Sequence, residues 1–92
     1  MSVTIHLSGH LKPLTGDAVE VNLPGDFATV GNALDSLWQH HPALRDRVLN
    51  EQGEIRQHVN IFAGSDDIKR LEGLATRLST DELHIFNAVS GG

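Results

Sequence analysis

Residues 30–39 read Val-Gly-Asn-Ala-Leu-Asp-Ser-Leu-Trp-Gln and carry the clearest helix pattern in the chain. Its apolar residues recur at i, i+3, i+4, i+7 and i+8, which places them on one stripe of a helix. They are Val30, Ala33, Leu34, Leu37 and Trp38. Thr29 supplies the hydroxyl that a helix N-cap needs, and Pro42 prevents a simple continuation of the helix. We expect one amphipathic helix over 30–39, with its apolar stripe, Trp38 included, turned to a core.

Runs that alternate apolar and polar residues flank this helix. Before it, the apolar positions are Val3, Ile5 and Leu7, then Val19, Val21 and Leu23; after it, they are Val59 and Ile61, then Leu83 and Ile85. A period of two is typical of half-buried strands. The first two runs are joined by the turn-like residues 12–17 and predict an antiparallel hairpin.

Shorter segments lie between the helix and the last strand. Pro42, with Leu44 and Val48 behind it, predicts a short second helical segment. Residues 64–67 read Gly-Ser-Asp-Asp and predict a solvated turn. The scattered apolar residues that follow predict core anchors in an irregular segment or short edge strand; they are Ile68, Leu71 and Leu74.

The order of elements is a hairpin, a crossing helix and returning strands. A sheet with a helix on one face is an α+β layer arrangement, and these are the ingredients of a β-grasp fold with a mixed sheet. We assign residues 1–87 to this domain. Residues 88–92 show no pattern and are expected to form a flexible C-terminal tail.

Composition limits the partners that the chain can have. It has 92 residues, enough for one domain, a formal net charge of −5 and no cysteine. The negative charge argues against nucleic acid and anionic membrane surfaces, and the missing thiols exclude disulfides, thiolate nucleophiles and thiolate metal sites. The first residues lack the features of a signal peptide and no apolar run is long enough to span a membrane, so a cytoplasmic protein is expected.

A family resemblance emerges from four short stretches. They are His58-Val59-Asn60-Ile61-Phe62, Gly73-Leu74-Ala75-Thr76, Asp81-Glu82, and Ala88-Val89-Ser90-Gly91-Gly92. With them, the chain resembles the ubiquitin-like sulfur carriers of the MoaD/ThiS family, and it looks most like the CysO-type carriers. It departs from the family at Thr80, where glycine is frequent, and at Asn87, where proline is frequent.

The resemblance implies a cycle of acyl activation at Gly92. An E1-like partner enzyme would use ATP and magnesium to adenylate the Gly92 carboxylate, and a sulfur donor would then displace AMP to leave a thiocarboxylate. A second enzyme, the large subunit of molybdopterin synthase or a cysteine synthase, would accept the sulfur. The chain itself would be a co-substrate that is not an enzyme and binds no cofactor.

The two terminal glycines suit that chemistry physically. Gly92 has no Cβ, so attack on its carbonyl carbon is unhindered, and Gly91 has wide φ/ψ freedom, which lets the tail enter a narrow channel.

Strand alternation also predicts a docking surface. If the apolar residues of the last two strands point inward, Phe62, His84 and Phe86 share the opposite face. Exposed apolar patches often mark partner sites, so these three residues, with Val89 of the tail, are expected to bind partners. The plainer alternative is that one of the two phenylalanines is covered by a loop.

Three further readings stay open. The chain could be a ubiquitin-like modifier conjugated through Gly92, the small subunit of molybdopterin synthase, or an interaction domain with an inert tail. The sulfur acceptor is equally open. No metal site is expected. His40 and His41 are adjacent rather than three or four residues apart on a helix, His6 and His10 straddle the end of a predicted strand, and no cysteine or compact carboxylate cluster accompanies them.

Overall fold

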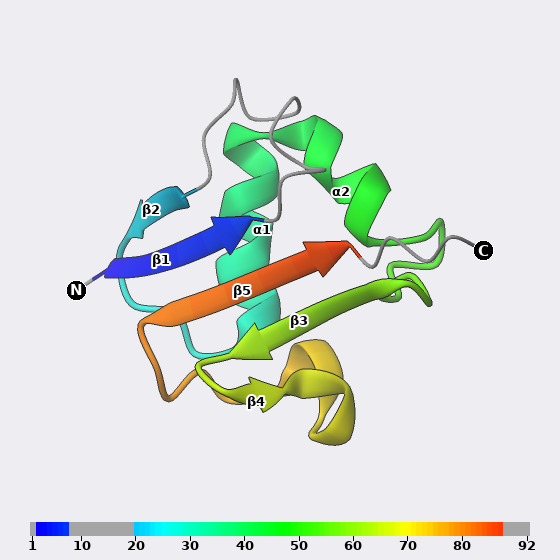
Figure 1. Cartoon of the computed structure of the whole chain (residues 1–92). Coiled ribbons are helices and arrows are strands. Elements are labelled where there is room, and N and C mark those ends of the chain that lie inside the picture. The colour runs from blue at the N-terminus through cyan, green and yellow to red at the C-terminus, as the bar shows by residue number, and fades with distance from the viewer. Residues whose placement is uncertain (1, 8–19, 88–92) are drawn as a thin grey trace.

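The computed structural model describes residues 2–7 and 20–87, which build one five-stranded sheet and two α-helices (Figure 1). The strands are β1 (Ser2–Leu7), β2 (Glu20–Pro24), β3 (Val59–Ala63), β4 (Asp66–Asp67) and β5 (Glu82–Asn87). Their order across the sheet is β2-β1-β5-β3-β4. The sheet is mixed, because β1 and β5 run parallel while the other neighbours are antiparallel. This architecture confirms the predicted α+β class and the predicted hairpin pairing.

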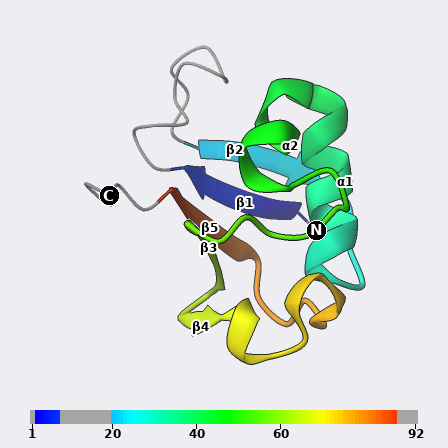
Figure 2. The ribbon, with the colours of Figure 1, turned by 90° about the vertical axis from the view of Figure 1, so that its right-hand side faces the viewer.

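Helix α1 (Val30–His40) forms where the apolar stripe predicts it. The Thr29 hydroxyl accepts a hydrogen bond from the Asn32 backbone N–H at 3.1 Å, which confirms the N-cap. All five stripe residues are buried, and Trp38 is only 8% exposed. Helix α2 (Pro42–Val48) begins with Pro42 in its first turn, as predicted, and both helices lie on one side of the sheet (Figure 2).

The core fills the space between α1 and the sheet. Alternate strand residues face the helices and are buried, including Val3, Ile5 and Leu7 of β1 and Leu83 and Ile85 of β5. Because the strand period is two, the intervening residues point to the opposite side. No helix in the described part of the chain is both long enough and apolar enough to cross a membrane.

The segment after β3 differs in part from its prediction. Gly64 has φ of 62°, in the left-handed region that favours glycine, and turns the chain into β4, so Asp66 and Asp67 form a short edge strand rather than a turn. Ile68 is buried, but Leu71 is 52% exposed and is not a core anchor. The reason is local: the chain leaves the 3₁₀ helix Ile68–Arg70 at Leu71, whose φ and ψ of −110° and −126° are not helical.

The Gly73–Thr76 stretch is attached to the start of α1. The Val30 backbone N–H donates to the Thr76 carbonyl at 3.0 Å, so this segment satisfies one of the unpaired donors of the helix N-terminus. The Thr76 hydroxyl accepts from the Glu72 N–H at 3.1 Å. A Cβ at Gly31 would come within 3.0 Å of the Leu74 carbonyl oxygen, so the approach is close. This stretch therefore has a structural role.

The packing predicts a specific stability difference. Leu37 is fully buried against the sheet, so Leu37→Ala should lower the free energy of unfolding by about 2–5 kcal/mol, through lost burial and the cavity left behind. The matched control is Leu71→Ala, the same change at an exposed site, which should alter it by less than about 0.5 kcal/mol. Urea denaturation of both variants measures this, and equal losses would contradict the described core.

Candidate functional site on the open face of the sheet

The face of the sheet turned away from the helices holds the candidate site. Strand β5 lies between β1 and β3 (Figure 1). Its outward side chains therefore occupy the middle of that face. These outward residues are Glu82, His84 and Phe86, since Leu83 and Ile85 face the core. The predicted docking residues of β5 therefore occupy the centre of the open face.

Phe62 and Phe86 are in contact, as the predicted shared face requires. Their ring centroids are 5.9 Å apart with the planes at 79°, an edge-to-face arrangement. Phe86 is 46% exposed, Phe62 is half-buried, and the His84 ring lies 6.1 Å from that of Phe86 with nearly parallel planes. Strand pairing explains the contact, because β3 and β5 are antiparallel neighbours.

An exposed leucine, Leu71, extends this apolar surface. The sequence analysis did not predict that Leu71 is exposed. A hollow of about 330 Å³ beside Phe62 is lined by Leu71 as well as by Asp66, Asp67 and Arg70. Leu71 was expected in the core, and it instead joins Phe62 and Phe86 in what we name the apolar strip. The exposure of Leu71 follows from the direction in which the backbone leaves the 3₁₀ helix, which no sequence pattern predicts.

Two histidines and two glutamates lie beside the strip. The parallel register of β1 and β5 places His6 opposite His84. Their rings stack with centroids 4.5 Å apart and an interplanar angle of 12°. His6 Nε2 lies 2.9 Å from Glu82 Oε1, and His6 Nδ1 lies 3.4 Å from Glu20 Oε1. No spacing along one element would have found this group, because it depends on strand pairing.

The predicted residues of the tail lie outside the described part of the chain. These are the reactive Gly91 and Gly92 and the partner-binding Val89, so their placement and the division into 1–87 and 88–92 stay predictions. Strand β5 ends at Asn87, which pairs with Val59 at the start of β3. Residues 88–92 therefore follow from this end of the sheet, with Asn87 alone between Phe86 and Ala88.

A pair of arginines, Arg47 and Arg56, stands at the same end of the sheet. Arg47, Arg56 and His58 line a hollow of about 350 Å³ together with Asp46. Arg56 is held in place, because its Nε donates to the Asp46 carbonyl at 2.8 Å. The chain as a whole has a net charge of −5, so the two arginines form a local region of positive charge near the point where β5 ends.

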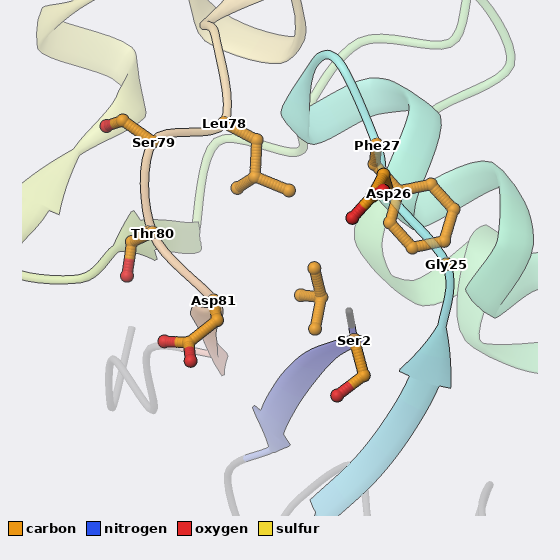
Figure 3. Close-up of a pocket in the computed structure, with 9 residues that line it drawn as sticks. Ser2, Gly25, Asp26, Phe27, Leu78, Ser79, Thr80 and Asp81 are labelled. Carbon is orange, nitrogen blue, oxygen red and sulfur yellow. The ribbon is translucent and has the colours of Figure 1, made fainter.

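A further hollow, of about 510 Å³, lies at the other end of β1 and β5 (Figure 3). Residues 25–27 form one wall and residues 78–81 the other, with Ser2 between them. Because it opens where β5 begins, it is far along the strand from the start of the tail.

Comparison with known proteins decides the family. The model of the ThiS family matches residues 5–92. The chain belongs to the ThiS family. The expected MoaD/ThiS resemblance is thereby confirmed.

Three relatives agree with this family in sequence and fold. Small archaeal modifier protein 1 of Haloferax volcanii is 43% identical over 74 residues, 80% of each chain, and its crystal structure matches with a TM-score of 0.83 at 35% identity, covering 100% of both chains. The sulfur carrier protein CysO of Mycobacterium tuberculosis is 30% identical over an alignment of 95 residues that covers 100% of both chains. A chain in the crystal structure of the Amycolatopsis orientalis BexX/CysO complex has a TM-score of 0.84 at 26% identity, with 98% and 99% of the two chains covered. The predicted ubiquitin-like β-grasp fold is confirmed.

Proposed function

We propose that this ThiS-family chain is a sulfur carrier whose Gly92 carboxylate is activated and thiolated by partner enzymes. The observation that supports it most is the family match, which extends through Gly91 and Gly92 to residue 92. Its similarity to CysO over the full length of both chains points the same way. The chain itself is a co-substrate, and the partners supply catalysis.

The proposed chemistry takes place in two displacements on the partner. A Gly92 carboxylate oxygen attacks the α-phosphorus of ATP and pyrophosphate leaves, with Mg²⁺ neutralising the phosphate charge. A sulfide nucleophile then attacks the acyl carbon, and AMP leaves with the former carboxylate oxygen. ATP and Mg²⁺ are bound by the partner, while this chain contributes an unhindered acyl carbon at a residue without Cβ.

Partner recognition is assigned to the apolar strip and His84. Large exposed apolar side chains that stand together favour docking, and Phe86 and Leu71 are the large hydrophobic residues recorded as exposed in the described segments. Phe86 is followed by Asn87, where β5 ends. Residues 88–92 span at most about 18 Å when extended, so a partner that binds Phe86 must place its activating site within that reach.

The partners follow from this role. We propose an E1-like adenylating enzyme for activation and, for transfer, a sulfur-acceptor enzyme such as the large subunit of molybdopterin synthase or a cysteine synthase. The arginine pair, Arg47 and Arg56, lies at the end of the sheet that leads to residues 88–92. It would favour an acidic surface on either partner.

A second candidate is a ubiquitin-like modifier. It is favoured by the 43% identity to small archaeal modifier protein 1. The activation step is the same, but a lysine amine instead of sulfide attacks the activated Gly92, and the product is an isopeptide bond. The two roles therefore differ in the product and share the docking surface.

Deleting Gly92 should abolish thiocarboxylate formation and leave the stability of the domain unchanged. The deletion withdraws the carboxylate by about 3.5 Å, and a misplacement of about 1 Å already costs ~100-fold in rate. The measurement is intact mass after incubation with the adenylating enzyme, ATP, Mg²⁺ and a sulfur donor. Gly92→Ala, which keeps the length, should react more slowly but still react. Equal charging of the truncated chain would rule out Gly92 as the sulfur site.

Phe86→Asp should weaken binding to the adenylating enzyme by ~10-fold or more, since it places a charge where a partner buries a ring. Isothermal titration calorimetry measures the affinity. The matched control is Ala43→Asp, which puts the same charge on an exposed site of α2, on the helical side of the sheet. Unchanged affinity for a folded Phe86→Asp variant, or an equal loss for the control, would remove Phe86 from the docking surface.

A further inference from the structure

A group of metal-binding side chains stands on the open face beside the apolar strip. One ligand atom each from His6, Glu82 and His84 lie within 4.8 Å of one another. Glu20 approaches the same group from β2, with its Oε1 at 3.4 Å from His6 Nδ1. The side chains of this group therefore come from three neighbouring strands of the sheet, β2, β1 and β5.

The charges around His6 favour a cation. A carboxylate oxygen faces each of its two ring nitrogens, Glu82 at Nε2 and Glu20 at Nδ1. A neutral imidazole has one N–H and can donate to only one of them. At the other nitrogen, a lone pair faces a carboxylate oxygen unless a positive charge stands between them. A second proton on the ring would remove this conflict, since an imidazolium donates from both nitrogens. A divalent cation at Nε2 removes it as well, because Nδ1–H is then left to donate to Glu20.

We propose that His6, Glu82 and His84 bind one first-row divalent cation, with Zn²⁺ as the best match, and that Glu20 orients His6. Two imidazoles and a carboxylate, with a fourth position open, are a known zinc ligand set. A carboxylate on the far nitrogen of a ligating histidine fixes its tautomer and raises its basicity. The ligand chemistry disfavours Mg²⁺ and Ca²⁺, which prefer all-oxygen sites.

The backbone is already in place for such a site. The parallel ladder pairs His6 with His84 and Thr4 with Glu82, so the ligands are anchored on regular strands rather than on loops. Tetrahedral zinc ligands stand about 3.3 Å apart, and His6 Nε2 and Glu82 Oε1 are 2.9 Å apart.

One side-chain adjustment is required. The rings of His6 and His84 are stacked 12° from parallel, so their in-plane lone pairs run side by side and do not converge. Rotation of the His84 ring brings them together, and His84 is only partly buried on the open face. Zinc binding should therefore break the stack and move His84 relative to Phe86.

The site would link metal binding to the docking surface. His84 contacts both His6 and Phe86, so its rotation changes the edge of the apolar strip. The ion would also neutralise the two glutamates on this part of the face. Its fourth position faces solvent and could take a ligand from a docked partner. The metal site does not depend on the proposed sulfur chemistry.

The test is a zinc titration of the full chain without an affinity tag, by isothermal titration calorimetry and by NMR of the histidine rings near neutral pH. We expect one-to-one binding with shifts in the ring signals of His6 and His84, and no binding of Mg²⁺ or Ca²⁺. Glu82→Gln and His84→Gln should each abolish the binding. Glu20→Gln should weaken it by ~10-fold, the usual effect of losing a carboxylate behind a ligating histidine.

The matched control is His58→Gln, which removes an exposed histidine at the start of β3 and should leave zinc affinity unchanged. Circular dichroism of each variant establishes that it is folded. Absence of saturable zinc binding to the native chain would overturn the proposal whatever the variants do. So would a loss in His58→Gln as large as that in His84→Gln, which would indicate scattered surface binding.

Discussion

The parallel pairing of β1 with β5 is the constraint on which the rest of the structure depends. It inserts the last strand between the first and the third, so that β5 has a hydrogen-bonded neighbour on each side. Leu83 and Ile85 are fully buried beneath α1. The strand that leads into the tail is thus among the most firmly anchored parts of the fold.

The same pairing determines the chemistry of the open face. The helices cover one side of the sheet, and alternation turns every second residue of β5 to the other. Because β3 and β1 lie on either side, the outward residues of β5 meet Phe62 on one side and His6 on the other. Apolar and ionisable groups are thereby juxtaposed on the surface next to the end of β5. One strand thus connects the core, the proposed docking surface and the end of the sheet that leads to residues 88–92.

Much of this arrangement follows from periodicity in the sequence. The stripe from Val30 to Trp38 predicts α1 and its buried face, and alternation in 59–62 and 83–86 predicts that Phe62 and Phe86 share a side. These inferences succeed because helix and strand periods depend on neighbouring residues alone. Leu71 was misplaced because a short 3₁₀ turn has no comparable period, and its direction depends on where the backbone leaves the turn.

The cluster of His6, Glu82 and His84 is a feature that periodicity in the sequence does not predict. His6 lies 76 positions before Glu82 in the chain, and only the register of β1 against β5 brings it to Glu82 and His84. A sequence search for ligands spaced along one element can therefore find Glu82 and His84 of β5 but not His6. The predicted β-grasp topology, with its first and last strands paired, would have placed His6 on a strand next to that of His84. The register of the two strands would still have been needed to place the two side chains opposite each other.

Tandem mass spectrometry of the C-terminal tryptic peptide, from the protein isolated from its own cells, tests most directly whether Gly92 holds sulfur. No lysine or arginine follows Arg77, so trypsin releases residues 78–92 as one peptide. A sulfur carrier should yield a fraction of this peptide with one oxygen of the Gly92 carboxylate replaced by sulfur. A peptide found only as the plain carboxylate, or joined through Gly92 to lysines of other proteins, would contradict the sulfur-carrier role, and the second result would establish a modifier.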